Sequence, residues 1–243
     1  MDIISTHFLY RVKQRYTLIW RCVFVLCATP VLWLLGEWLS GNLGINPLNR
    51  LLHFSGLCAL ILMLITLTVT PLRRCAVTLS SYTRQAYGKR LSDWNWLIKL
   101  RRQLGLFAFF YACLHLLIYL GLDATWDFAA VRTDLLDRPF ILLGFLSFSL
   151  LIPLAATSNN MAMRWLGGHW RTLHKLSYVI IVCETVHYWL QMKVGQTAAL
   201  PYAVCAAVLL AYRLWAWLRN DRFAGVEVQE RVQEQVQNKA AEM

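Results

Sequence analysis

The stretch RRQLGLFAFFYACLHLLIYLGL, residues 101–122, carries the pattern that decides the fold. After its two arginines it continues to Leu122 without a single Asp, Glu, Lys or Arg. A helix rises about 1.5 Å per residue, so about twenty residues span the ~30 Å hydrocarbon core of a bilayer. The stretch lacks the alternation of a barrel strand and is far longer than the ~10 residues of one. We therefore predict a transmembrane helix with one histidine, His115, inside the membrane.

The rest of the chain has the same apolar character. Of its 243 residues, 58% are hydrophobic and only 15% are charged. This composition excludes an ordinary soluble domain and a disordered chain, because so much apolar surface must be hidden from water. We expect an all-α membrane protein, a six-transmembrane-helix bundle occupying residues 18–218. Its six expected spans are 18–39, 51–72, 103–122, 139–157, 172–192 and 198–218.

The Lys and Arg residues predict the direction of these spans. The loops on one side carry seventeen of them, and the loops on the other side carry four. Because Lys and Arg are enriched in cytoplasmic loops, both terminal segments, 1–17 and 219–243, are expected in the cytoplasm. The acidic loop 123–138 is then expected outside. The net charge of +11 is explained by topology, so it gives no support to nucleic-acid binding.

Two histidines inside the expected spans are the first candidate site residues, because ionisable groups in a membrane are costly and usually functional. His115 lies in the third span and His187 in the fifth, and these spans run in the same direction. Both are therefore expected in the outer half of the membrane at similar depth. Two facing imidazoles can ligate b-type haem in the core of a helix bundle. They can also form a simple hydrogen-bonded pair, and the spacing does not separate these readings.

A second group of candidates lies toward the cytoplasmic ends of the same spans. Arg101 precedes His115 by about four helical turns and shares its face, which places Arg101 opposite His174. A second haem could be held there. An ideal helix would turn His174 about 140° away from His187. A bend, a π-bulge or an irregular first turn is therefore expected between these two histidines.

Three further residues are weaker indicators. His169 shares the face of His187 but is expected among the lipid headgroups, and His53 opens the second span at the outer surface; both are alternative haem ligands. Glu184 precedes His187 in an ExxH step, which di-metal bundles contain twice and this chain contains once. A small transporter or proton relay using intramembrane His and Glu is the alternative function. It lacks the inverted repeat and interrupted helices typical of transporters.

The longest internal loop is expected at residues 73–100. Within it Leu91, Trp94, Leu97 and Ile98 recur at helical spacing among polar residues. Such a pattern is typical of a short amphipathic helix that lies in the membrane interface. We therefore expect a separate surface helix on the cytoplasmic leaflet.

Six motifs occur in order along residues 47–196. They are HFSG at 53–56, TPL at 70–72, RRQLGLFAFFYACLH at 101–115, RPFILLG at 138–144, LAATS at 154–158 and LGGHWRTLHKLSYVIIVCETVHYWLQMKVG at 166–195. Together they resemble the MsrQ (YedZ) family, the haem-binding membrane subunits of bacterial periplasmic methionine sulfoxide reductase systems. Motifs in a fixed order are far more specific than a pair of histidines.

The resemblance implies a ferric reductase-like six-helix bundle in the bacterial cell inner membrane. It implies one or two b-type haems and bound FMN, although no residue can be assigned to FMN binding. Electrons from the quinone pool or a cytosolic flavin reductase would pass through haem to a periplasmic molybdopterin-containing subunit. That partner is the catalytic subunit, which reduces methionine sulfoxide in oxidised proteins.

The resemblance also implies roles for single residues. The family's haem histidines correspond to His115, His174 and His187 of this chain. Related transmembrane oxidases have four ligating histidines, and Arg101 stands where the fourth would be, or contacts a haem propionate instead. The loop at 73–100 is longer than expected for the family.

The charge asymmetry makes the topology testable. An alkaline phosphatase reporter, which is active only after export, is expected to be active when fused after Asp127 and inactive when fused after Arg90. The reason is the excess of Lys and Arg on the side of the 73–100 loop. Activity at Arg90 together with silence at Asp127 would show the reverse orientation and place the acidic loop in the cytoplasm.

Overall fold

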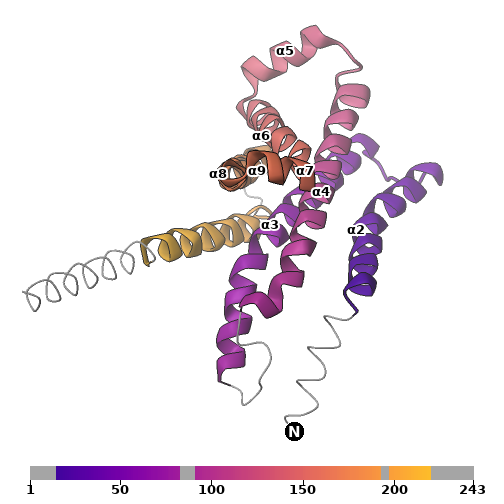
Figure 1. Ribbon diagram of the computed structural model, residues 1–243. Coiled ribbons are helices and arrows are strands. Elements are labelled where there is room, and N and C mark those ends of the chain that lie inside the picture. The colour runs from indigo at the N-terminus through magenta and orange to yellow at the C-terminus, as the bar shows by residue number, and fades with distance from the viewer. Residues whose placement is uncertain (1–14, 83–90, 193–196, 220–243) are drawn as a thin grey trace, which may run out of the picture.

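A computed structural model describes residues 15–82, 91–192 and 197–219. Every regular element in these ranges is a helix (Figure 1), which confirms the all-α prediction. The terminal segments expected at 1–17 and 219–243 lie almost entirely outside the described residues.

The helices follow one another with short connections. They are α2 (Tyr16–Leu39), α3 (Pro47–Ser81), the 3-10 turn η1 (Leu91–Trp94), α4 (Asn95–Ile118), the π-helical turn η2 (Tyr119–Asp123), α5 (Phe128–Asp137), α6 (Pro139–Ala156), α7 (Asn160–Leu166), α8 (Gly168–Leu173), α9 (Leu176–Gln191) and a last helix, Leu200–Arg219. Within the described ranges, five are long and apolar enough to cross a membrane: α2, α3, α4 with η2, α6 and the last helix. The expected fifth span corresponds to α9, which has 16 residues.

The prediction of a loop with a separate surface helix at 73–100 is wrong. Helix α3 continues through Pro71 to Ser81, and α4 already begins at Asn95. The apolar residues at helical spacing therefore belong mainly to the first turns of α4 and to the 3-10 turn before it. No Gly or Pro stands between Leu91 and Leu104, so nothing in the sequence separates a surface helix from the span that follows.

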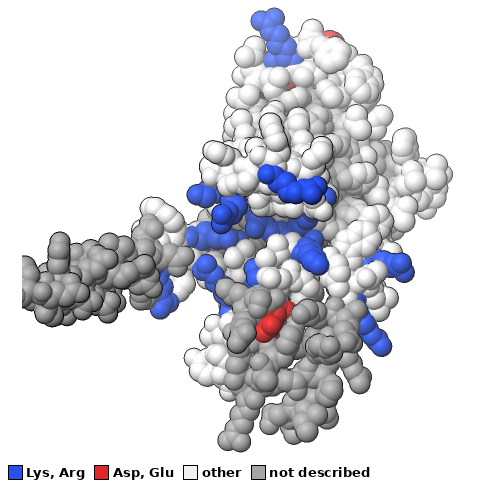
Figure 2. Space-filling view, in the orientation of Figure 1, with Lys and Arg blue, Asp and Glu red and all other residues white. Residues whose placement is uncertain are grey.

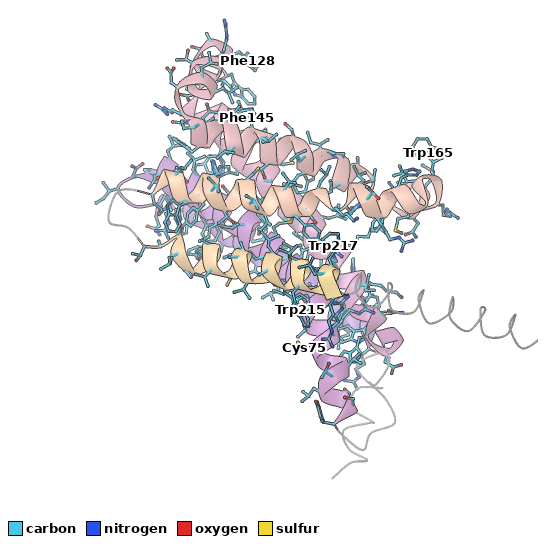
Figure 3. All side chains as sticks on the ribbon, turned by 90° about the vertical axis from the view of Figure 1, so that its left-hand side faces the viewer. Cys75, Phe128, Phe145, Trp165, Trp215 and Trp217 are labelled. Carbon is cyan, nitrogen blue, oxygen red and sulfur yellow. The ribbon has the colours of Figure 1, made fainter. Side chains whose placement is uncertain are left out.

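Two helix pairs make up the centre of the molecule. Helix α3 packs along α4, and α6 packs along α9. Figure 3 shows α6, α9 and the last helix side by side, with α3 crossing them. The shared core contains Leu67 of α3, Ala108 of α4, Ile180 and Ile181 of α9, and Ala206 of the last helix, all almost fully buried. Phe128 on α5 and Trp165 on α7 mark opposite ends of the α6–α9 pair (Figure 3).

The outside of the bundle is apolar. Large hydrophobic side chains are exposed along every long helix, for example Leu26, Leu117 and Leu142, as expected where lipid is the solvent. On the face seen in Figure 2, Lys and Arg gather at and below the level of α8, and the part around α5 and α6 carries few of them. On this face the charges are therefore unevenly distributed along the bundle.

Tyr111 attaches α2 to this core. Its side chain is completely buried, and its hydroxyl donates to the Cys27 carbonyl at 2.8 Å and accepts from the Val31 N–H at 3.1 Å. These are the two backbone groups that an uninterrupted helix would bond to each other. Pro30 stands between them inside α2. The Tyr111 hydroxyl thus provides hydrogen bonds for two backbone groups of α2 beside Pro30. Lipid could not provide them.

The variant Tyr111→Phe is expected to loosen α2 from α4, because it removes a buried hydroxyl that bonds two backbone groups. Loss of such a partner costs about 1–3 kcal/mol, so the thermal unfolding temperature of the detergent-solubilised protein should fall. Tyr82→Phe is the control, because Tyr82 is 84% exposed. Equal stability of the two variants would contradict this role.

Candidate functional site

The site centres on two imidazoles from different helix pairs. His115 of α4 and His187 of α9 face each other with ring centroids 6.2 Å apart and planes nearly perpendicular, at 88°. The expectation that these histidines meet at similar depth is confirmed. They line a cavity of about 280 Å³ between α3, α4, α6 and α9. Asp123 and Arg138, which flank α5, line the same cavity, so it lies toward the α5 end of the bundle.

Each imidazole is held by a backbone carbonyl of the neighbouring helix. Nδ1 of His115 lies 2.9 Å from the Leu52 oxygen, and Nδ1 of His187 lies 2.5 Å from the Phe140 oxygen. Because a carbonyl oxygen only accepts hydrogen bonds, Nδ1 carries the proton in both rings. Nε2 is then left with a free lone pair, which is the arrangement found in histidines that bind metals.

A glycine allows each of these contacts. Gly56 follows Leu52 by one helical turn, and Gly144 follows Phe140 by one turn. A Cβ atom added at Gly56 would lie 3.0 Å from the His115 ring, and one added at Gly144 would lie 3.0 Å from the His187 ring. The contact between an imidazole, a carbonyl and a glycine therefore occurs twice, once between α3 and α4 and once between α6 and α9. The two glycines are the last residues of the motifs HFSG and RPFILLG, and the sequence alone did not predict their role.

The same cavity contains polar groups beside the pair. Nε2 of His53 lies 3.2 Å from the Tyr188 hydroxyl, so this histidine already has a partner inside the protein. Glu184 accepts a hydrogen bond from the Ser147 hydroxyl at 3.5 Å, and its other oxygen, Oε2, is buried without a partner. Most of the remaining lining is apolar. His53 thus lies in the site wall, and Glu184 adds a carboxyl group that the sequence left without a role.

His174 lies at the other end, between two helices. It caps α8, and α9 begins at Leu176, so the irregular turn expected between His174 and His187 is confirmed. Its ring stacks on Trp170, with centroids 3.9 Å apart, and Nδ1 lies 3.0 Å from the Trp170 oxygen. Nε2 is buried and has no hydrogen-bond partner. His169 is exposed on α8.

Arg101 lies near His174, as expected from the sequence. It is half-buried on α4, and its charge acts on His174. The two residues approach from different helices toward the same end of the bundle. A guanidinium stays protonated and donates only, so Arg101 can bind an anionic group beside His174 but is no ordinary metal ligand.

The geometry of the histidine pair fits a haem iron. Two imidazoles bound to one metal ion at about 2.0 Å have ring centres roughly 6 Å apart, since each nitrogen lies about 1 Å from its ring centre. The observed 6.2 Å matches this spacing. The apolar walls suit a porphyrin, and both Nδ1 atoms are engaged so that Nε2 is available. At the other end, the orphaned Nε2 of His174 fits a second metal ligand.

Comparison with known proteins places these features in a family. Residues 55–184 match the family model described as the ferric reductase like transmembrane component. This segment contains α3 from Ser55 onward, all of α4 and α6, and α9 as far as Glu184.

Individual relatives extend the similarity over most of the chain. The protein-methionine-sulfoxide reductase heme-binding subunit MsrQ of Herminiimonas arsenicoxydans is 41% identical over 211 residues, covering 85% of this chain and 89% of that protein. The MsrQ proteins of Ralstonia nicotianae and Caulobacter vibrioides are 42% and 36% identical, and cover 82% and 86% of this chain. The matches cover 86% and 92% of those two proteins.

The variant Gly144→Ala is expected to displace the His187 ring, because its Cβ would stand 3.0 Å from the imidazole. Overpacking typically costs about 1–3 kcal/mol, and the middle of this range corresponds to roughly thirtyfold weaker haem retention. Haem per protein, measured after purification in detergent, reports the effect. Gly105→Ala is the matched control, since its Cβ would meet only Thr66, at 3.9 Å. Equal haem content in both variants would contradict the glycine's role.

Proposed function

Because this chain belongs to the ferric reductase-like transmembrane family and to the MsrQ haem-binding subunits, we propose that it is the membrane electron-transfer subunit of a bacterial methionine sulfoxide reductase system. It receives electrons from the quinone pool or a cytosolic flavin reductase. It passes them through b-type haem to a periplasmic molybdopterin-containing catalytic subunit, which repairs oxidised periplasmic proteins. The observation that carries this proposal is the pair of His115 and His187, whose rings lie 6.2 Å apart. Each ring is held in the same way, by a backbone carbonyl and a glycine of a neighbouring helix.

The proposed setting is the bacterial inner membrane, crossed six times, with both termini in the cytoplasm. Helix α9 is the additional span, continued by the turn at His174 and by α8. The cavity of His115 and His187 then faces the periplasmic side, and α5 lies above it. The loops expected on the opposite side carry seventeen Lys and Arg residues, which supports this orientation.

The residues of the chain position and insulate the electron carrier. A bound haem supplies one-electron chemistry that no amino-acid side chain here provides. His115 and His187 hold it through Nε2, and the Leu52 and Phe140 carbonyls keep both imidazoles in the required tautomer. The mostly apolar walls of the cavity would influence the potential of a bound redox group.

A second haem is proposed at the cytoplasmic end, held by Nε2 of His174. This nitrogen is buried, has no partner, and is oriented by the hydrogen bond from Nδ1 to Trp170. Arg101 stands beside it and is proposed to bind an acidic group of a cofactor, such as a haem propionate, rather than the iron, because a guanidinium offers no lone pair. FMN, implied by the resemblance, completes the proposed cofactor set.

A visible spectrum tests the function directly. The protein purified from haem-replete cells is expected to give sharp b-type haem bands when the dithionite-reduced spectrum is compared with the oxidised one. An electron conduit must also transfer electrons to the catalytic subunit after reduction. A transporter or proton relay predicts neither result, so the absence of haem bands would reject the proposed function.

The variants His115→Ala and His187→Ala are expected to share one phenotype. Each removes one of the two imidazoles at the same iron, so the outer haem should be lost or become high-spin, and electron delivery to the partner should stop. Because both residues act as a unit, the double variant should be little worse than either single variant.

His169→Ala is the control for this comparison, because His169 is exposed on α8. The visible spectrum and the rate of partner reduction are the measurements. Intact low-spin spectra in both single variants, with only a lower unfolding temperature, would show that the two histidines have a structural role.

A further inference from the structure

An arginine lies inside the last helix, surrounded along the chain by apolar residues. Arg213 stands within Leu200–Arg219, one of the helices apolar enough to cross a membrane. Its guanidinium donates to the Leu67 carbonyl of α3 at 3.2 Å and lies 5.7 Å from the centre of the Tyr178 ring of α9. The side chain is therefore directed into the bundle. Trp215, two residues further on, is exposed and can be followed in Figure 3.

A second guanidinium approaches the same place from another helix. Arg101 of α4 lies within electrostatic range of both Arg213 and Tyr178, and its charge also acts on His174. Helices α4, α9 and the last helix thus bring two positive charges to one half-buried region. In the described part of the chain, Arg50 forms an ion pair with Glu37 and Arg138 forms one with Asp134. Neither Arg101 nor Arg213 is paired with a carboxylate there.

Two partly buried cations without a counter-ion repel each other, and the low dielectric of the interior strengthens this repulsion. Intramembrane arginines accordingly pair with an opposite charge, with backbone carbonyls or with a ligand. The Leu67 carbonyl accepts one hydrogen bond from Arg213, but it neutralises no charge. A separate observation also indicates a ligand: Nε2 of His174 is buried without a hydrogen-bond partner.

We propose that Arg101 and Arg213 together form an anion-binding site beside His174 that takes the acidic group of a bound cofactor. The planar fork of a guanidinium matches carboxylate and phosphate oxygens equally well. The anion is therefore either a propionate of the haem on His174 or the phosphate of FMN. This proposal rests on the proposed function, which supplies the cofactor, and it adds Arg213 as a binding residue.

The test measures both cofactors in one sample. The full chain and its variants Arg101→Gln and Arg213→Gln are purified in detergent from haem-replete cells. Haem is measured as its pyridine complex, and flavin by fluorescence after release with acid. Loss of the inner haem from both variants identifies a propionate as the anion, and loss of flavin from both identifies the phosphate. The outer haem should keep its low-spin spectrum, because His115 and His187 are unchanged.

Two controls separate binding from folding. Arg102→Gln changes the next residue of α4, which is exposed and bonds to Asn160 at 3.0 Å, so it should keep both cofactors. Arg213→Lys retains the positive charge and should restore part of the lost cofactor if charge is what binds. A structural role of Arg213 instead predicts a lower unfolding temperature with unchanged cofactor content in every molecule that remains folded.

Two results would decide against the proposal. If the wild type holds its cofactors and both glutamine variants retain them fully, the anion site does not exist. If Arg102→Gln loses the same cofactor to the same extent, the cofactor loss results from the lower positive charge of the region. It then does not show a specific site formed by Arg101 and Arg213. A wild type without haem or flavin would reject the proposed function itself, which keeps the two failures distinct.

Discussion

The structure depends on one contact that is made twice: an imidazole N–H bonded to a carbonyl of a neighbouring helix. The carbonyls of Leu52 and Phe140 each have a second lone pair beyond the bond within their own helix. Glycine one turn later removes the side chain that would keep the ring away. This contact joins α3 to α4 and α6 to α9, and it leaves Nε2 unengaged on two histidines that line one cavity. The separation of the two imidazoles, and hence the metal they suit, follows from it.

The lipid environment explains the polar contacts elsewhere in the bundle. Where water is absent, each backbone or side-chain polar group needs a partner inside the protein. Tyr111 meets this need for α2 beside Pro30, and Tyr188 meets it for His53. Against this background the unsatisfied atoms are informative. Nε2 of His174, Oε2 of Glu184 and Oε1 of Gln103 are buried without partners, and the first two lie beside the places where cofactors are proposed.

Much of the site could be predicted from the chain alone. The shared direction of two spans predicts that His115 and His187 meet, and the structure confirms it. The same helical arithmetic predicts an irregular turn near His174, which is also confirmed. The prediction of a surface helix within 73–100 is wrong, because helical spacing indicates a helix but not where it ends. The sequence does not single out Arg213, because one charge changes the mean hydropathy of an apolar span very little.

The sequence by itself determined that the chain is helical and apolar, how its charges are divided, and which histidines lie within the spans. These properties depend on composition and on the spacing of residues along a single helix. They can therefore be predicted without knowing which other helices pack against it. The tertiary structure decided the roles of Gly56 and Gly144, the contacts of Arg213 with α3 and α9, and the partner of His53. Each of these depends on how closely two helices distant in sequence approach each other, and that distance is set by packing of side chains across the bundle.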